Sequence, residues 1–155
     1  MTYPDFSEPA SLREWMESIP HQRAIGFELV DIGAGFAVGR IPYRPVLVGN
    51  PASGVVHGGI VTTLLDTVGG MAALARQGEF LVMATLDLRI DYLRPSTPGE
   101  DLSGRVECYK LTRNVAFTRG FAFNADPDDP LASMSATYML NTPAARSSPR
   151  THAKP

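Results

Sequence analysis

Only one stretch of this chain has the apolar periodicity of a long helix, and that stretch constrains the fold more than any other feature. After His57-Gly58-Gly59, apolar residues recur at steps of three and four up to about residue 77, namely Val61, Leu64, Leu65, Val68 and Ala72. Hydrophobic residues occupy most of the circumference of this helix, so it has to be covered on most of its sides. The remainder of the chain must supply that cover.

The segments on either side alternate between apolar and polar residues, which is typical of β-strands. Ahead of the helix, residues 24–32 and 36–41 predict a hairpin around a Gly-Ala-Gly turn, and the connection from Pro42 to Gly54 is predicted to be a loop. The short connections favour antiparallel pairing. After the helix the pattern predicts four more strands, over residues 81–94, 101–111, 114–124 and 131–141.

A short amphipathic helix is predicted near the N-terminus. Ser11-Leu12-Arg13-Glu14 has the spacing of a capping box, and apolar residues follow at helical steps until Pro20 ends the helix. The predicted fold class is therefore α+β, with a curved antiparallel sheet wrapped around one long central helix. We expect one domain over residues 1–141, followed by a disordered tail over residues 142–155 that is rich in Pro, Ala, Ser and basic residues.

Composition removes several classes of function. The chain has a formal net charge of -2 and no basic excess, which argues against a nucleic-acid partner. Ile60 to Ala75 is too short, and with Asp66 too polar, to span a bilayer, so no membrane partner is expected. The lone Cys108 and the absence of a recognisable signal sequence favour the cytoplasm, and Cys108 lies on the apolar face of its strand, as a core residue would. The three histidines are too scattered to predict a metal site.

Asp66 is the first candidate for chemistry, because a carboxylate in the middle of an apolar helix needs a partner, water or a ligand. Its neighbours on the same helical face are all small or hydroxylated, which leaves room for a ligand. The alternative is that Asp66 is a solvated or interface residue and that the glycines serve packing. These neighbours are Gly59, Thr62, Thr63, Gly69 and Gly70.

His57-Gly58-Gly59 is the second candidate, because it begins the same helix. The unsatisfied N–H groups and the positive end of the helix dipole could bind a carbonyl oxygen or an anion there. A histidine in this position can equally cap the helix or pack. Together, a helix start that polarises a carbonyl and a carboxylate on the same helix could supply the electrophilic and basic halves of a hydrolase.

These residues resemble those of a known family, the hot-dog-fold acyl-CoA thioesterases of the phenylacetate-pathway (PaaI-like) type. The resemblance covers about residues 24 to 141. It rests on Asn50, Gly54, His57-Gly58-Gly59, Asp66 nine positions after the histidine, and the strand from Thr85 that ends in Leu93-Arg94-Pro95 ahead of Gly99. It implies a hot-dog fold, an acyl-CoA substrate and no cofactor.

The resemblance also implies roles for individual residues. Asp66 would be the general base or the nucleophile, and the Gly59 N–H would polarise the thioester carbonyl. Asn50 and His57 would orient the substrate, and Thr85 would position water. Gly58 would contact the substrate, and Arg113 would contact coenzyme A, unless Arg113 is an ordinary arginine of a hairpin turn. A non-catalytic acyl-CoA-binding module and, ranked lower, a hot-dog hydratase remain as alternatives.

The spacing along the helix predicts a homo-oligomer. Gly59 and Asp66 are seven residues apart, which corresponds to roughly 10 Å along a helix axis. One thioester cannot readily reach both groups, because reacting atoms must approach to about 3–3.5 Å. We therefore expect the two groups that serve one substrate to come from two chains, in a dimer or a dimer of dimers.

Overall fold

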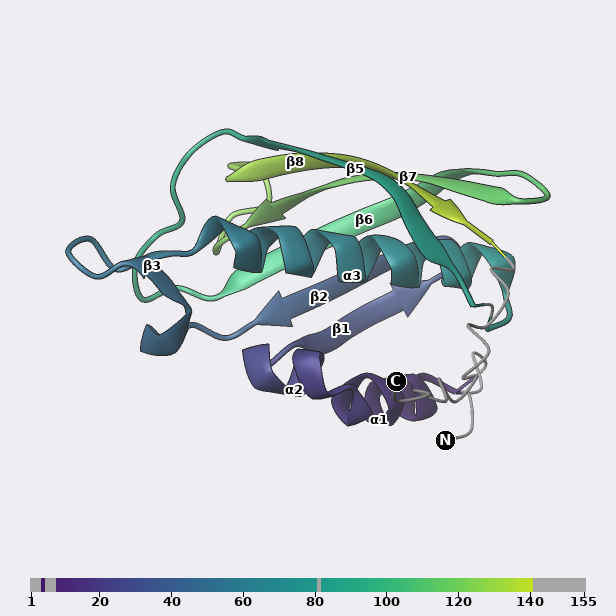
Figure 1. Cartoon of the computed structure of the whole chain (residues 1–155), viewed down its shortest axis with the longest axis horizontal. Helices are drawn as coiled ribbons and strands as arrows, with labels where there is room; N and C mark the ends of the chain where they lie inside the picture. Colours follow the sequence, from purple (N-terminus) through teal and green to yellow (C-terminus); the bar gives the residue numbers. More distant parts are fainter. Residues whose placement is uncertain (1–3, 5–7, 81, 141–155) are drawn as a thin grey trace, which may run out of the picture.

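The computed structural model describes residues 4, 8–80 and 82–140, which form a six-stranded antiparallel sheet with one long helix on its face (Figure 1). The strand order is β1-β2-β6-β7-β8-β5, and β3 and β4 form a separate two-stranded sheet. The helices are α1 (Pro9–Ser18), α2 (Pro20–Ile25), the 3-10 helix η1 (Pro45–Leu47) and α3 (Gly58–Gln77). The strands are β1 (Glu28–Gly33), β2 (Phe36–Ile41), β3 (Val48–Asn50), β4 (Val55–Val56), β5 (Ala84–Tyr92), β6 (Leu102–Leu111), β7 (Val115–Phe123) and β8 (Ala132–Met139).

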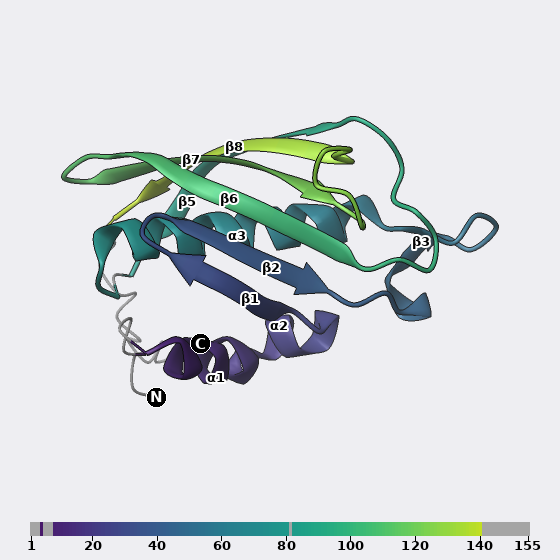
Figure 2. The ribbon, with the colours of Figure 1, turned by 180° about the vertical axis from the view of Figure 1, so that it is seen from behind.

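Helix α3 is the centre of the core, as its periodicity predicts. Leu64, Leu65 and Val68 are fully buried between the helix and the concave face of the sheet. Figures 1 and 2 show the sheet curving around α3 from opposite sides. By length and composition α3 could cross a membrane, but ten of its residues are buried inside this domain, so it is the core helix of the fold. The predicted fold class is confirmed.

Cys108 is confirmed as a core residue of β6, where it is 5% exposed. Burial raises the pKa of its thiol, which disfavours the reactive thiolate.

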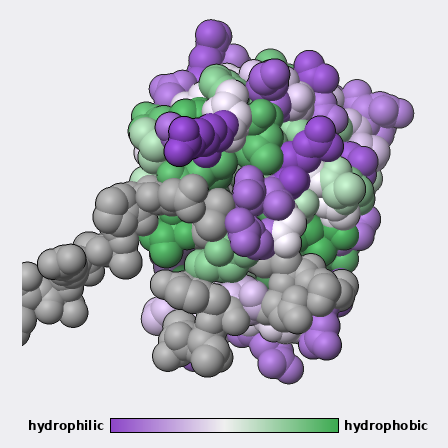
Figure 3. All heavy atoms as spheres, turned by 90° about the vertical axis from the view of Figure 1, so that its right-hand side faces the viewer, coloured by the Kyte–Doolittle hydropathy of each residue, from purple (hydrophilic) through white to green (hydrophobic). Residues whose placement is uncertain are grey.

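At the end of the molecule where α3 ends and β5 begins, hydrophobic and hydrophilic residues are interspersed on the surface (Figure 3).

The N-terminal segment differs from the prediction. Helix α1 begins at Pro9 after Glu8, so the predicted capping box at Ser11 is wrong. Helix α1 ends at Ser18, just ahead of Pro20 as predicted, but Pro20 also begins the second helix α2, which was not predicted. Proline fits the first turn of a helix while the residue before it stays extended. Gly26, in the left-handed conformation at φ 74°, ends α2. The first strand consequently begins at Glu28 and not at residue 24.

Other boundaries differ less. The connection predicted as a loop contains the short strand β3, which pairs with β4 immediately after the connection and fixes the chain just before α3. Strand β5 begins at Ala84, later than predicted, and residue 81 lies outside the described residues. The predicted tail over residues 142–155 also lies outside them.

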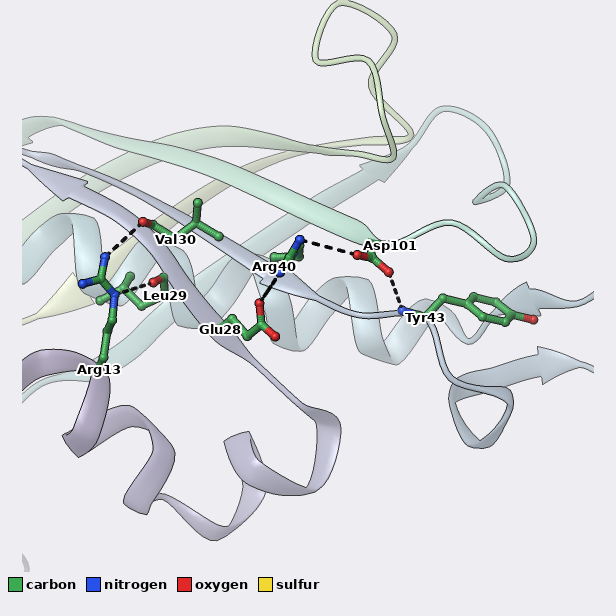
Figure 4. A network of polar contacts seen from close by, with 7 residues as sticks. All are labelled: Arg13, Glu28, Leu29, Val30, Arg40, Tyr43 and Asp101. Carbon is green, nitrogen blue, oxygen red and sulfur yellow. Dashed lines mark hydrogen bonds and ion pairs between the residues drawn. The ribbon is translucent and has the colours of Figure 1, made fainter. Parts of the chain in front are cut away.

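Arg13 fastens α1 to the edge of the sheet (Figure 4). Its guanidinium donates to the carbonyl oxygens of Leu29 at 3.1 Å and of Val30 at 3.3 Å. The register of β1 with β2 shifts between Leu29 and Asp31, so Val30 is the bulged residue. Arg13 therefore satisfies backbone groups at the irregular point of β1 and holds α1 against the sheet.

Candidate active site

Hydroxyl groups from two strands surround the carboxylate of Asp66. The Thr85 hydroxyl on β5 donates to Asp66 Oδ1 at 3.0 Å. The Tyr138 hydroxyl on β8 lies 3.3 Å from Asp66 Oδ1 and 3.0 Å from the Asp66 carbonyl oxygen. The sheet thus brings residues 19 and 72 positions away in sequence to one carboxylate. Asp66 and Thr85 are brought together as the sequence analysis expected, whereas Tyr138 was not anticipated.

Tyr138 is held protonated at this site. It is 2% exposed, and its burial, followed by the negative charge of Asp66 and the hydrogen bond to it, raises the pKa of the phenol well above its ordinary value of 10.0. Gly69 makes the approach possible, because a Cβ added at Gly69 would overlap the Tyr138 hydroxyl. The glycine that the sequence placed on the same face as Asp66 therefore admits a hydrogen-bond donor from the sheet.

The side chain of His57 caps the N-terminus of α3. His57 is the N-cap of α3, and its Nδ1 accepts a hydrogen bond from the Gly59 N–H at 2.9 Å. The Tyr92 hydroxyl, from the end of β5, donates to the Gly58 carbonyl oxygen at 2.8 Å. His57 thus has the capping geometry that the sequence analysis kept as its alternative, and a carbonyl that binds the Gly59 N–H must displace the imidazole.

Asn50 lies in the connection that leads into α3. Its side-chain oxygen accepts from the Ala52 N–H at 3.1 Å, and its carbonyl oxygen accepts from the N–H groups of Ser53 and Gly54. In this structure Asn50 therefore shapes the β3–β4 turn. The His57 N–H donates to the Leu47 carbonyl, which ties the same connection to the start of the helix.

A pocket of about 350 Å³ has Asp66 in its wall. Thr85 and Tyr138 line the same pocket, which places the hydroxyl donors and the carboxylate at one surface. Helices α1 and α2 close another side of it. Most of the remaining lining is apolar, from Trp15, Met16, Ile19, Gly70, Met71, Leu74 and Met83. A mainly apolar pocket with a few convergent polar groups is the usual form of a small-molecule site.

Arg113 is remote from the helix start. It lies in the turn between Leu111, where β6 ends, and Val115, where β7 begins. Across the sheet Val115 pairs with Met139, which pairs with Ala84 at the beginning of β5. Tyr92, which contacts the start of α3, is at the other end of β5. Within one chain, Arg113 and Gly59 are therefore at opposite ends of the molecule.

Among the described residues, no group of three or more His, Cys, Asp or Glu side chains is arranged to hold a metal ion.

The sequence analysis did not predict the side of the pocket formed by α1 and α2, which includes Trp15 and Gln22. The apolar periodicity of α1 indicated a buried face but could not show what that face covers.

Comparisons with known proteins agree with this geometry. The sequence model of the thioesterase superfamily matches residues 53–131, which include α3 and β5. A relative from Salmonella typhimurium, the medium/long-chain acyl-CoA thioesterase YigI, is 30% identical over 135 residues, covering 79% of this chain and 86% of the relative.

Solved structures share the fold. A protein from Pseudomonas aeruginosa is 41% identical, with a TM-score of 0.74 over 82% of this chain and 94% of that one. The PaaI protein from the phenylacetic acid degradation operon of Escherichia coli is 19% identical, with a TM-score of 0.73 over 83% of this chain and 89% of that one. This second likeness supports the fold alone. The extent of the sequence match, together with the helix-in-sheet architecture, shows that the chain belongs to the thioesterase superfamily with a hot-dog fold.

Proposed function

We propose that this thioester hydrolase cleaves an acyl-CoA to the free acid and coenzyme A, with Asp66 as its central catalytic group. The observation that carries the proposal is the position of the Asp66 carboxylate, in the wall of a mainly apolar pocket and hydrogen-bonded by Thr85. An apolar pocket suits an acyl chain, and a positioned carboxylate can act as the general base or the nucleophile of thioester hydrolysis.

Two routes use the same carboxylate. Asp66 can accept a proton from water as the water attacks the thioester carbonyl carbon, or it can attack that carbon itself to form a transient anhydride that water then hydrolyses. In both routes the C–S bond breaks, and coenzyme A leaves as a thiolate that takes up a proton. In the first route, the Thr85 hydroxyl is placed to orient the water. Tyr138 stays protonated and acts as a hydrogen-bond donor to Asp66, which keeps the residue in position in either route.

The start of α3 supplies the electrophilic half of the proposed site. The carbonyl oxygen of the thioester would replace His57 Nδ1 as the acceptor of the hydrogen bond from the Gly59 N–H, and the helix dipole would stabilise it there. The released imidazole, with Gly58 and Asn50 nearby along the chain, would orient the rest of the thioester. Because Gly59 and Asp66 are separated by roughly 10 Å along the helix, we propose that these two halves come from different chains of a dimer.

The pocket favours an acyl group of medium length. Its apolar lining extends from Asp66 to residues of α1 and, along α3, to Leu74. The end of the lining at Leu74 is therefore distant from the carboxylate. Each buried methylene contributes about 0.8 kcal/mol to binding, so a chain that fills the lining gains affinity over acetyl. The name of the Salmonella relative, a medium/long-chain acyl-CoA thioesterase, supports the same substrate class.

Thiol release from a panel of acyl-CoA esters tests the proposal. We expect hydrolysis of medium-chain esters, and we expect Asp66→Asn to lower kcat by at least ~10²-fold, because the amide keeps the size of the carboxylate but not its basicity or charge. Circular dichroism and thermal unfolding of the variant provide the control for folding. Tight binding of acyl-CoA without thiol release would instead support an acyl-CoA-binding module, and near-normal turnover by Asp66→Asn would exclude the assigned role.

A further inference from the structure

One polar side chain in the apolar wall of the pocket is only half satisfied. Gln22, from α2, is 9% exposed and lines the pocket that contains Asp66. Its Nε2 donates to the Thr67 hydroxyl at 3.0 Å. Its Oε1 is buried and has no hydrogen-bond partner among the described residues. Buried carbonyl oxygens are nearly always paired, so this one marks a position at which a donor is expected.

The position of Gln22 relative to the catalytic carboxylate follows from its hydrogen bond. Thr67, which anchors the Gln22 carboxamide, is the next residue after Asp66 in α3, and both line the same pocket. Adjacent residues of a helix differ by 1.5 Å in rise. The Gln22 carboxamide is therefore held beside Thr67, near the level of Asp66 along the helix and not near the far end of the pocket at Leu74.

The chemistry of this oxygen restricts its partner. A neutral carboxamide oxygen accepts one or two hydrogen bonds, and a hydroxyl group can donate one without the desolvation cost of a buried ammonium group. An unsubstituted hydrocarbon chain can pack against the apolar residues around Gln22, but it has no donor for this oxygen and would leave it unpaired. A hydroxyl on the chain would satisfy the oxygen and keep the remainder of the chain against the apolar wall.

We propose that Gln22 is a specificity-determining residue that accepts a hydrogen bond from a hydroxyl group on one of the first carbons of the acyl chain, so that hydroxyacyl-CoA esters are preferred. The inference rests on the proposed function, because it assumes that the pocket holds the acyl group. A site built to bind a hydroxyl rejects the analogue that lacks it, because its own polar group is then left unpaired. The preference therefore depends on Oε1 and disappears with it.

The experiment compares octanoyl-CoA with its 2-, 3- and 4-hydroxy derivatives as substrates. We expect the wild-type protein to hydrolyse one hydroxy isomer with a kcat/KM about 10-fold above that of octanoyl-CoA, as one hydrogen bond allows. Gln22→Met keeps the length of the side chain but removes the acceptor, and this ratio should fall to about one. The double variant Gln22→Met/Thr67→Val leaves neither partner unpaired and serves if the single variant does not fold.

Two outcomes would overturn the inference. One is a ratio that Gln22→Met leaves unchanged, in a folded protein that hydrolyses all four esters. The other is loss of stability in Gln22→Met and Thr67→Val alike with no change in selectivity, which would make Gln22 an anchor of α2. If the protein hydrolyses no ester, the proposed function fails, and calorimetry decides on Gln22 separately. There, one of 2-, 3- and 4-hydroxyoctanoate should bind the Asp66→Asn protein more tightly than octanoate, and Gln22→Met should abolish the difference.

Discussion

The two edge strands of the main sheet, β1 and β5, differ in how far their edges are covered. At β1 the chain protects its own edge. Arg13 of α1 donates hydrogen bonds to the carbonyl oxygens of Leu29 and Val30, and a bulge interrupts the strand. At β5, in the described part of the chain, the strand has a hydrogen-bonded neighbour on one side only. Most of β5 is exposed, and Leu86 and Tyr92 are each 54% exposed.

The difference bears on which edge the proposed dimer would use. An exposed edge with apolar side chains invites pairing, and proteins that do not use such an edge usually cover or interrupt it. The closed edge lies beside α1, whereas the open edge carries Thr85 and Tyr92, which contact Asp66 and the start of α3. The proposed dimer would therefore join through the edge on which the site is built.

The largest expected effect tests whether the open edge really brings two half-sites together. Gly59→Pro removes the N–H that would polarise the carbonyl, at a cost of about 2.7–4 kcal/mol in the barrier, and Asp66→Asn removes the carboxylate. Each variant should be nearly inactive alone. When the two are unfolded and refolded as a mixture, activity should return to at most roughly a quarter of the wild-type value, because half of the dimers are mixed and each has one intact site.

Gly59→Ala is the matched control for this experiment, because it crowds His57 in a similar way but keeps the N–H. It should retain more activity than Gly59→Pro. Mass spectrometry must show that mixed dimers have formed. If they have formed and no activity returns, each site takes both groups from one chain and the comparison of the edges loses its functional meaning.

A smaller effect is expected at the closed edge, and it should concern stability and not chemistry. Arg13→Met removes two hydrogen bonds from a charged donor while keeping a long apolar side chain, and we expect it to lower the free energy of unfolding by about 1–3 kcal/mol. Denaturant titration measures this value. Arg13→Lys keeps the charge but not the forked geometry and should recover only part of the loss. A stable Arg13→Met protein would show that β1 does not depend on α1 for its closure.

The smallest effect is expected away from both edges, in the β6–β7 turn. If Arg113 contacts coenzyme A, Arg113→Ala should lower kcat/KM for acyl-CoA by up to ~5-fold, as expected for one exposed charge pair. Short thioesters without nucleotide phosphates should be hydrolysed as before. Steady-state kinetics on both substrate types provides the measurement. Equal effects on both would identify Arg113 as a structural residue of the turn.

The fold was predictable where periodicity is long. Twenty residues of α3 and the alternating residues of β5 repeat their pattern often enough to identify each element. The short elements were not predictable in this way. Helix α2 has six residues and strand β4 has two, so neither completes a recognisable repeat, and their existence depends on Pro20, Gly26 and tertiary packing.

The site was predictable only along the chain. Asp66, Gly59 and His57 share one helix, so their relation follows from helix geometry. Tyr138 and Gln22 reach the same pocket from segments 72 and 45 residues away from their partners in α3. Nothing in the local sequence specifies such contacts, because they depend on how the sheet curves and on where α2 packs.

In the proposed dimer, the charges on β5 would bias the register in which two copies of this strand pair. Asp87, Arg89 and Asp91 point to one face of the strand, and this order of charges reads the same in both directions. In an antiparallel pair of two identical strands, the alignment that sets Arg89 against itself also sets Asp87 against Asp91, which is unfavourable. A shift of the alignment by two residues in either direction sets Arg89 against an aspartate of the other strand. The symmetry of these charges would thus disfavour the alignment with Arg89 opposite itself and favour the two alignments shifted by two residues. A strand of another protein without this charge pattern would not be stabilised in any of the three alignments.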